Sequence, residues 1–599
     1  MTIADEAQPA ASGRTGLIRL GVGLAQGLAL YGLQQADQHK VWPATTPWLN
    51  AALALAAGFV PLIVLAGFGT LRRLTLIVWT LGAALVVAML AGWDVSRDSV
   101  TSGGAPKLIA DFPVMLFSAA FLFIAHHLIA PADQVRRPIA PYPAYFDTAW
   151  KHGVQLILSI AFTGVFWILL FLGAELFRLI GLTFLHALIT KGWFAMPASG
   201  VVFAGAVHLT DVRAGVTRGI RTVALVLLSW LLPVMTLIAV GFLAALPFTG
   251  LEPLWKIGRS TAILLSASAA LIVLLNAAYQ DGSEEARANP VLRWTGRATA
   301  LALLPLIAIA AYGLHLRIGQ HGLTPERIIA AACLVVGAIY AVGYAVAAVL
   351  PGPWMKRLEP TNVADAFVIL AVILWLFSPV GDPGRWSTDD QIARLKDGRT
   401  AADRFDYGFL RFGAGDYGRA ALKRLAASHG GKDSAAIAAG AAKAAAASSR
   451  WELTTLTTRA PDLGARIRLH PAGARLPDGF AAQAWPAGAG PCALTPDGQT
   501  CDAWLIDVDR DGRPEVVVEE TFALSIYAAD GKGGWRALGT ASACGDRDAV
   551  HKAIQAGPIG ATPSRLDDLK AGSIVFRITP ECQAGSAEGL ASPQPKRSK

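Results

Sequence analysis

Charged residues are scarce in this chain. Only 16% of its 599 residues are Asp, Glu, Lys or Arg, whereas 54% are hydrophobic. Soluble domains usually carry about 25% charged residues. The deficit lies in the first two thirds of the chain, where apolar runs reach the roughly 20 residues that cross a bilayer. The composition therefore excludes an ordinary soluble protein and indicates a membrane protein with many spans.

Familiar catalytic motifs are missing as well. The chain contains no Walker A motif, no G-x-S-x-G and no H-E-x-x-H, and we therefore favour a protein without enzymatic activity. A cleavable signal is not evident either, because the start MTIADEAQPAASGR carries acids and no A-x-A-like site follows a compact apolar core. We expect the first span to act as an uncleaved anchor.

The formal net charge of +9 would be compatible with a nucleic-acid partner, but we reject this hypothesis. Lys and Arg lie in short turns between apolar runs, a pattern typical of polytopic membrane proteins. We expect the lipid bilayer as a partner and no nucleic acid. The sequence leaves protein partners and the oligomeric state open.

Eleven apolar segments are long enough to be membrane helices. They lie near residues 16–34, 49–70, 74–94, 108–130, 153–176, 193–209, 222–247, 261–279, 298–316, 328–350 and 363–380. Beside the fifth segment, Phe177–Thr190 carries Arg178 and His186, and we expect an interfacial helix there. The predicted fold class is an all-α membrane bundle of about 11 helices, followed by a small β-rich extracytoplasmic domain.

The loop charges predict the orientation. One set of span ends holds fifteen Lys and Arg residues and the other holds nine. Short cytoplasmic loops carry the excess of positive charge, so we expect the N-terminus inside. An odd number of spans then places everything after Pro379 on the periplasmic side of a bacterial inner membrane.

The cysteines provide an independent test of this orientation. Cys333 lies within a span and is expected to be a buried small apolar residue. Cys492, Cys501, Cys544 and Cys582 all follow the last span, and an even cysteine count in an exported domain suggests disulfides. We favour Cys492–Cys501 and Cys544–Cys582, because the first pair closes a short loop. The alternative is four free thiols in a cytoplasmic domain.

The composition divides the chain into five regions. After the last span come short amphipathic helices, an Ala-rich stretch, and then strand-like runs near Ala503–Val508, Glu515–Glu519, Ala523–Ala528 and Ser573–Thr579. The predicted regions are a disordered N-terminus (1–13), a transmembrane domain (14–381), an amphipathic and Ala-rich helical linker (382–449), a β-rich periplasmic domain (450–583) and a disordered tail (584–599).

An acidic loop lies within the β-rich region. Asp507, Asp509 and Asp511 occupy positions 1, 3 and 5, and Gly512 occupies position 6, as at the start of a calcium loop. Alternate carboxylates would point inward around a hard cation, and glycine permits the sharp turn.

The end of this loop departs from an EF-hand, which requires Glu at position 12, where this chain has Val518. The loop instead looks like the calcium loops of FG-GAP-type β-repeats, with the carbonyl of Arg513 at position 7 and Glu515 at position 9. We expect a structural Ca²⁺ bound in a β-hairpin. The alternative is an Asp-Gly hairpin turn that holds no ion.

Ionisable residues are rare in the predicted spans, where they are functional candidates by default. They are Asp111, His126, His127, Glu175, His208 and Asp211. His208 and Asp211 are three residues apart on one helical face and would form a proton relay. The adjacent His126 and His127 diverge by about 100° on a helix and should not form a metal pair. For most of these residues we favour the other interpretation, interfacial caps and packing hydrogen bonds, because they lie within a turn or two of a predicted span end.

Four segments together resemble a known family. They are Tyr145–His152, Leu274–Gly282, Gly322–Arg327, and Gln391–Gly398 with Phe405-Asp406. In this order they resemble the bacterial inner-membrane family called domain of unknown function 4153, over about residues 50–425. The resemblance implies a polytopic inner-membrane protein without assigned chemistry, and it supplies no catalytic residues. The region after 450 lies outside it.

Three functions are compatible with these observations. We favour a sensor, scaffold or envelope component that displays a disulfide-bonded calcium-loop domain in the periplasm. The alternative is a transporter or permease for a small solute. An intramembrane enzyme acting on lipid-linked substrates is least favoured, and it would require a pocket that joins Glu326, Arg327 and Asp211.

Overall fold

The computed structural model describes most of the chain before residue 448. The described ranges there are 4–100, 106–256, 259–283, 289–428 and 433–447, followed by shorter segments that include 463–471, 473–483, 500–519, 523–531 and 533–541. The chain divides into two compact units, Met1–Ala446 and Ala447–Lys599, and each is treated by itself below.

Eleven of the described helices are long and apolar enough to cross a membrane, which confirms the predicted fold class. They are α1 (Ala4–Gln38), α2 (Pro47–Gly67), α3 (Arg73–Arg97), α4 (Phe112–Val135), α5 (Tyr142–Leu179), α7 (Gly192–Val212), α8 (Ala214–Thr249), α10 (Ser260–Tyr279), α11 (Pro290–His321), α12 (Pro325–Val349) and α13 (Leu358–Leu376).

The segment after the fifth span differs from the prediction. Helix α5 runs on to Leu179, so Arg178 lies in its last turn and not in a separate helix. A turn at Gly181, with φ of +81°, ends this run. The six-residue α6 (Phe184–Ile189) then follows and holds His186. A similar short helix, α9 (Glu252–Lys256), precedes α10.

Small residues allow the first span to pack tightly. A Cβ atom added at Gly23 of α1 would collide with the carbonyl oxygen of Gly200 in α7. One turn further along α1, Gly27 faces the backbone of Met196 just as closely. Backbone contact through small residues is a common basis of helix association in membranes, and it fixes α1 against α7.

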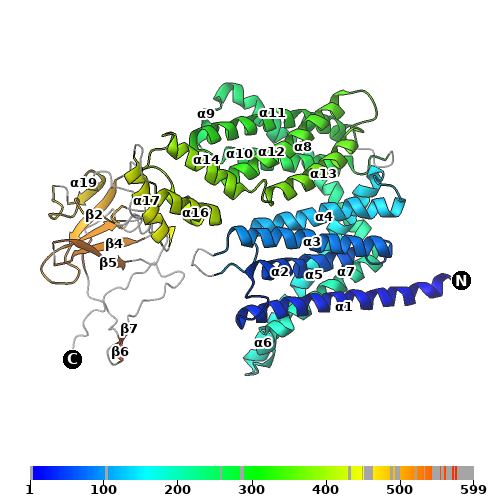
Figure 1. The fold of residues 1–599 in the computed structure, drawn as a ribbon, viewed down its shortest axis with the longest axis horizontal. Coiled ribbons are helices and arrows are strands. Elements are labelled where there is room, and N and C mark those ends of the chain that lie inside the picture. Colours follow the sequence, from blue (N-terminus) through cyan, green and yellow to red (C-terminus); the bar gives the residue numbers. More distant parts are fainter. Residues whose placement is uncertain are drawn as a thin grey trace, which may run out of the picture. The chain divides into compact units, whose positions relative to one another are not determined.

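The membrane helices form two apolar cores. One core involves α8, α10, α11 and α12, with Leu271, Leu303 and Tyr344 fully buried. The other involves α2, α3 and α4, together with the ends of α12 and α13. Figure 1 shows the blue and cyan helices on one side of this unit and the green helices on the other.

Four further helices belong to the first unit and form a cap on it. They are α14 (Pro383–Lys396), α15 (Tyr407–Phe412), α16 (Gly415–Ala426) and α17 (Ser434–Ala446). The amphipathic character predicted for this region is present in α16, which buries Ala421, Leu422 and Leu425.

The Ala-rich α17 is packed against its neighbours. Its Ala441 and Ala444 are fully buried, and a Cβ added at Gly440 would lie 2.6 Å from the ring of Tyr407. The small side chains that suggested a free linker instead let α17 approach α15 and α16 closely.

The second unit contains a five-stranded sheet of order β1-β2-β3-β4-β5. Its strands are β1 (Ile467–His470), after the short α19 (Leu463–Arg466), β2 (Cys501–Ile506), β3 (Glu515–Glu519), β4 (Leu524–Ala529) and β5 (Trp535–Ala541). Strands β1 and β2 are parallel and the other pairs are antiparallel. A separate hairpin pairs β6 (Leu569–Ala571) with β7 (Ile574–Phe576); β7 lies within the predicted strand Ser573–Thr579, whereas β6 was not predicted.

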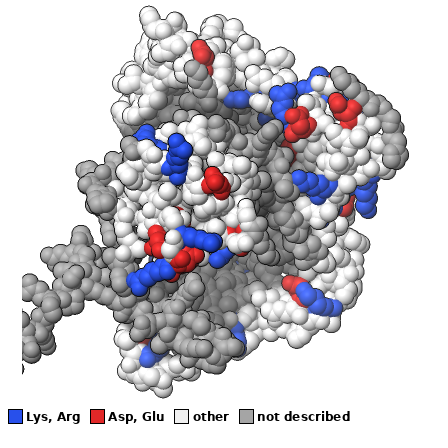
Figure 2. Space-filling model, turned by 90° about the vertical axis from the view of Figure 1, so that its left-hand side faces the viewer, with Lys and Arg blue, Asp and Glu red and all other residues white. Residues whose placement is uncertain are grey.

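A disulfide joins Cys492 to Cys501 at the start of β2, with the Cα atoms 5.8 Å apart. The first predicted pairing is thus present, whereas Cys544 and Cys582 lie outside the described residues. In the face shown in Figure 2, basic and acidic side chains lie interspersed among uncharged residues.

Candidate functional site

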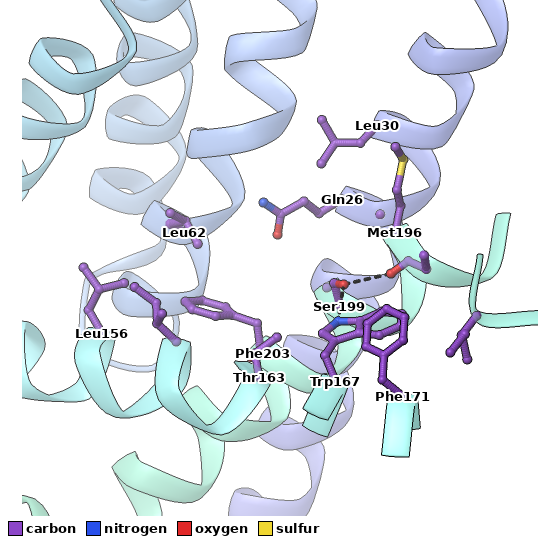
Figure 3. Close-up of a pocket in the computed structure, with 15 residues that line it drawn as sticks. Gln26, Leu30, Leu62, Leu156, Thr163, Trp167, Phe171, Met196, Ser199 and Phe203 are labelled. Atoms are coloured by element: carbon purple, nitrogen blue, oxygen red, sulfur yellow. Dashed lines mark hydrogen bonds between the residues drawn. The ribbon is translucent and has the colours of Figure 1, made fainter. Parts of the chain in front are cut away.

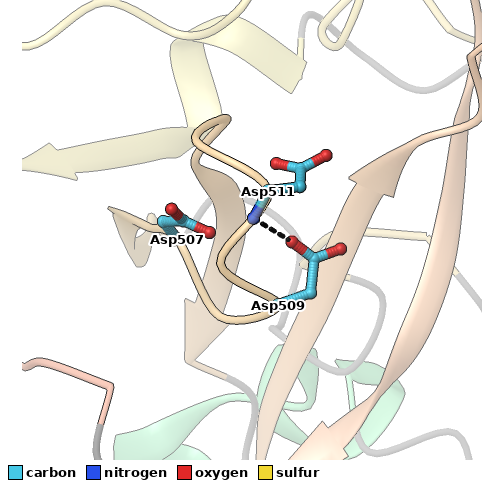
Figure 4. Close-up of side chains that lie close together, drawn as sticks. All are labelled: Asp507, Asp509 and Asp511. Carbon is cyan, nitrogen blue, oxygen red and sulfur yellow. Dashed lines mark hydrogen bonds between the residues drawn. The ribbon is translucent and has the colours of Figure 1, made fainter.

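The acidic loop connects β2 to β3 at the tip of an antiparallel hairpin. Ile506 and Glu515 are paired across the two strands, so the loop begins and ends where this strand pair ends. Asp507, Asp509 and Asp511 each offer a carboxylate oxygen, and these three oxygens lie within 4.8 Å of one another. Figure 4 shows the three side chains around the loop. The alternating spacing thus does bring the carboxylates together.

Backbone hydrogen bonds orient these carboxylates. The N–H of Asp511 donates to Asp509 Oδ1 at 3.1 Å, and the N–H of Gly512 donates to Asp507 Oδ2 at 3.1 Å. Arg510 and Gly512 adopt φ values of +64° and +84°, which let the chain reverse within a few residues. The other oxygen of Asp507 is buried and has no hydrogen-bond partner in the described part of the chain.

The two remaining predicted ligands lie differently. Glu515 is only 3% exposed, and its carboxylate accepts a hydrogen bond of 2.7 Å from the N–H of Val508. It is not a member of the three-carboxylate group. Arg513 donates its backbone N–H to Asp511 Oδ1 at 2.8 Å. Glu515 therefore closes the base of the loop, because β3 begins at this residue and directs its side chain into the hairpin.

The predicted partners His208 and Asp211 both lie on α7, but Asp211 is engaged elsewhere. Its carboxylate lies 3.0 Å from Arg19 of α1 and 2.8 Å from Lys151 of α5. His208 faces Gly16 of α1, and its Nδ1 atom is buried without a hydrogen-bond partner among the described residues. A direct His208–Asp211 relay is not formed. The ion pairs instead join three helices.

Asp111 and Glu175, the other two predicted intramembrane acids, are both about half exposed. Asp111 immediately precedes α4 and lies 2.7 Å from Lys107. Glu175 lies 2.6 Å from Arg178, one turn further along α5. The structure does not bring either residue to Asp211. Both residues lie in ion pairs near helix ends. The Glu175–Arg178 pair is exposed and should contribute little to stability, whereas Lys107 is buried and also pairs with Asp94 at 3.0 Å.

A cluster of three histidines was not predicted. His127 Nε2 of α4 lies 3.0 Å from His152 Nδ1 of α5, and His126 completes the cluster with ring centroids 5.4 and 5.5 Å from the other two. From the sequence, His126 was compared only with its neighbour His127. His152 lies on another helix, and its residue number alone gives no sign of the contact.

Hydrogen bonds determine the tautomers in this cluster. His126 Nδ1 accepts from the indole N–H of Trp79 at 3.2 Å, so its Nε2 carries the proton. His127 Nδ1 donates to the carbonyl of Phe123 at 2.6 Å, so its Nε2 accepts from His152. A metal at His126 Nε2 would require the opposite tautomer. This arrangement favours hydrogen bonding over metal binding at His126.

Asp365 of α13 was also missed. It is 0% exposed, and neither of its carboxylate oxygens has a hydrogen-bond partner in the described chain. The predicted span began at residue 363, which placed Asp365 at a membrane surface. The observed helix starts at Leu358, so Asp365 lies two turns inside it. The polar residues Glu359 and Asn362 concealed the true start.

These polar residues of α13 belong to a buried network. Asn362 donates to Asn276 Oδ1 at 2.6 Å and accepts from the hydroxyl of Tyr344 at 2.6 Å. The hydroxyl of Tyr142 lies 3.2 Å from the amide nitrogen of Asn362. The network joins α5, α10, α12 and α13 at the end of the bundle where α13 begins.

A family comparison supports the resemblance inferred from the sequence. The family described as Domain of unknown function (DUF4153) matches residues 43–425, which is more than half of the chain. The chain belongs to the DUF4153 family. No curated protein and no solved structure matches it.

Two of the segments that carry the DUF4153 resemblance contact each other. Gln391 of α14 donates to the carbonyls of His321 and Leu323 at 2.9 and 3.0 Å. The carboxylate of Asp390 accepts from the N–H of Leu323 at 2.7 Å. Gly322 has no room for a side chain, because an added Cβ would lie 2.5 Å from Gln391. The DUF4153 match therefore includes the joint between cap and membrane helices.

Hydrogen bonds of Asp382 and an ion pair of Arg419 complete this joint. Asp382 begins α14 and accepts hydrogen bonds from the N–H of Gly384 at 2.8 Å and the indole N–H of Trp93 at 3.2 Å. Arg419 of α16 lies 3.1 Å from Asp98, just beyond α3. Burial, together with the nearby charge of Asp382, raises the pKa of Tyr417 in α16. The cap is thus held at the end of α3 by charged contacts.

The cavities in the described part of the first unit include a polar one near the cap and an apolar one among the first membrane helices. The larger, of about 1210 Å³, is lined by residues that include Lys107, Asp111, Glu326 and Arg419. Arg327 and Asp211 are not among its lining residues, so it is not the pocket that a lipid-linked enzyme was expected to need. The smaller, of about 650 Å³, is mainly apolar and lies between α1, α2, α5 and α7. Figure 3 shows its side chains, including Gln26, Trp167 and Phe203.

Proposed function

We propose that this DUF4153 member is an inner-membrane protein that displays a disulfide-bonded, calcium-loop domain in the periplasm, where it acts as a sensor, scaffold or envelope component. The observation that carries the proposal is the convergence of Asp507, Asp509 and Asp511 at the tip of a hairpin. The family match supports an integral membrane protein, and the location and role are our inference.

The chemistry of the loop favours calcium. Carboxylates within 4.8 Å of one another repel each other unless a cation lies between them. Calcium takes oxygen ligands in flexible geometry, and the exposed tip leaves room for water to complete the coordination. The two flanking strands are paired, so binding would tighten an existing hairpin. A structural role follows from this.

Two observations support a periplasmic location. The positive loop charges are more numerous on the side of the membrane that holds the N-terminus. The Cys492–Cys501 disulfide is typical of an oxidising compartment. A green fluorescent protein fused after Lys599 should stay dark, whereas alkaline phosphatase fused there should be active. Bright fluorescence would refute the orientation.

Calcium binding can be tested on the full-length protein in lipid nanodiscs. Calcium at 100 times its Kd should stabilise the second unit by about 2.7 kcal/mol, measured as a rise in Tm relative to the protein in EDTA. The double substitution Asp509→Asn with Asp511→Asn should abolish the rise. Asp530→Asn is the matched control, because Asp530 follows β4 in another hairpin of the same sheet. Equal Tm values with calcium and with EDTA would exclude the ion.

A second candidate function is a transporter or permease for a small solute. It is favoured by one observation, the polar groups Asp365 and His126 deep among the spans. Uptake of a solute into proteoliposomes that is lost in Asp365→Ala would support it. No uptake across a broad panel of solutes would argue against it.

A further inference from the structure

Asp365 differs from the other buried acids of the described chain. Asp94 and Asp133 lie in ion pairs, with Arg97 and Arg72 respectively at 2.6 Å. Asp382 and Glu515 accept hydrogen bonds from backbone N–H groups. Asp365 is buried to the same degree, and neither of its oxygens has a partner. It is the one acid in this buried set whose charge has nothing to balance it.

An ionised carboxylate without a partner is very unfavourable in an apolar interior, and such a group becomes neutral instead. A proton neutralises it without further ligands. Sodium would need several additional oxygen ligands, which membrane proteins usually supply from broken helices. Helix α13 is continuous from Leu358 to Leu376, so its backbone carbonyls are engaged. The surroundings of Asp365 therefore favour a proton over a metal cation.

A series of polar side chains lies between Asp365 and one end of the bundle, although no hydrogen bond joins Asp365 to it among the described residues; we call this series the polar route. Asn362 lies one turn nearer to that end and belongs to the network with Tyr142 and Tyr344. The ring of Tyr142 lies 6.0 Å from the ring of Tyr279, centroid to centroid. The hydroxyl of Tyr279 donates to Glu359 at 2.7 Å, and Glu359 pairs at 2.7 Å with Lys356. The 51% exposed Lys356 side chain ends this route.

The neighbouring helix α4 brings a second unpartnered group to a similar depth. The rings of Phe117 and Phe377 are 5.3 Å apart, which aligns α4 with the end of α13. With a rise of 1.5 Å per residue, Asp365 lies roughly 18 Å along α13 from Phe377, and His126 lies roughly 14 Å along α4 from Phe117. The Nε2 of His126 is buried without a partner in the described chain. A donor and an acceptor, each unsatisfied, thus lie at similar depth on adjacent helices.

From these positions we propose that Asp365 is an intramembrane proton-binding site that exchanges its proton with solvent by way of the polar route around Asn362 and Tyr344. Of the ionisable groups on the helices nearby, Tyr340 of α12 interacts electrostatically with Asp365. Tyr344 of α12 is hydrogen-bonded to Asn362, one turn away, and the histidine cluster lies on α4 and α5. Protonated Asp365 is neutral. Loss of the proton leaves a charge among the spans that α12 and α13 can accommodate only by rearrangement or hydration. The inference is independent of the calcium loop.

Dicyclohexylcarbodiimide provides a direct test, because it reacts with protonated carboxyl groups in apolar surroundings. The carboxyl proton moves to a carbodiimide nitrogen while the carboxylate oxygen bonds to the central carbon, and rearrangement leaves a stable N-acylurea. The wild-type protein in nanodiscs would be treated across a pH series and digested, and the labelled peptides identified by mass spectrometry. We expect labelling of Asp365 at neutral pH that declines as the pH rises.

Infrared spectroscopy provides a second measurement of the protonation of Asp365 in the same protein. Wild type should show the carbonyl band of a protonated carboxylic acid, which Asp365→Asn removes. Asp133→Asn is the matched control, since Asp133 is a span residue of similar burial that pairs with Arg72, and this band should persist in it. If Asp365→Asn fails to fold, the labelling of wild type alone still decides the question.

Two outcomes would overturn the proposal. Absence of both the label and the infrared band over the whole pH range would mean that Asp365 is ionised. If sodium at constant pH protects Asp365 from labelling by dicyclohexylcarbodiimide, and potassium as the control salt does not, the site binds sodium instead. Neither outcome bears on calcium, whose test is the Tm of the second unit.

Discussion

The carboxylate of Asp211 on α7 lies 3.0 Å from the guanidinium of Arg19 on α1. Arg19 is 3% exposed, whereas Asp211 is 26% exposed and also contacts Lys151. One acid thus neutralises two basic residues from different helices. Because α1 contacts α7 through glycines next to this ion pair, charge and backbone packing together fix the first span.

Loss of this ion pair should destabilise the bundle. Arg19→Gln is expected to lower the free energy of unfolding by roughly 1–3 kcal/mol, below the range for fully buried pairs because Asp211 is partly hydrated and keeps Lys151. Denaturant unfolding in detergent micelles measures the change. Arg178→Gln is the control, since its pair with Glu175 is about half exposed on both sides and should contribute less than about 1 kcal/mol. Equal effects would contradict the prediction.

Glycine at position 23 should be required for the packing of α1. Gly23→Leu places atoms where the carbonyl of Gly200 lies, so we expect loss of folded protein or a large fall in Tm. Gly21→Leu, two residues earlier on the same helix, has no neighbouring atom within 4 Å of an added Cβ, and its Tm should stay near the wild-type value. A comparable fall in both variants would argue against close contact.

The disulfide should stabilise the second unit. Cys492→Ser is expected to cost about 2–3 kcal/mol, because the bridge closes a loop nine residues long in sequence separation. Thermal unfolding of this unit, with and without reductant, measures the loss. Cys333→Ser in α12 is the control and should respond to reductant as wild type does. Labelling of Cys492 by a thiol reagent in the native, unreduced protein would show that the bridge is absent.

Substitutions of Glu515 distinguish a structural role of this residue from a role as a calcium ligand. Glu515→Gln keeps a hydrogen-bond acceptor for the N–H of Val508 and should leave calcium affinity close to wild type. Glu515→Ala leaves that N–H unpaired and should lower stability by about 1–3 kcal/mol. Calcium titration by calorimetry, with Asp509→Asn as the positive control, measures affinity. Loss of affinity in Glu515→Gln as severe as in Asp509→Asn would restore it as a ligand.

Local patterns explain what the sequence predicted well. A membrane span is recognised from its own length and hydropathy, and all eleven spans were found in this way. The hairpin that holds Asp507, Asp509 and Asp511 is equally local, because the alternation of acids and the following glycine determine its turn. In both cases the residues that matter are close together in the chain.

The unpredicted features depend on contacts between distant segments or on a helix boundary. His152 meets His127 because α5 packs on α4, and their spacing of 25 residues shows no periodicity. Asp365 was placed at a membrane surface because the start of α13 was set five residues late. The hydrogen bond from Val508 to Glu515 is likewise not apparent from the position of Glu515 in the loop, and its role as a calcium ligand stays a prediction.

The contact between α16 and the end of α3 has a mechanical consequence. Gly415 touches the backbone of Arg97 so closely that an added Cβ would lie 2.6 Å from its carbonyl oxygen, and Arg419 pairs with Asp98 beside it. The anchor point of the second unit is therefore the end of α17 at Ala446, and not the end of the last span at Leu376. A pulling force on the C-terminal part of the chain would act first on the packing of α17 against α15 and α16, and would reach α3 through the contacts of Gly415 and Arg419.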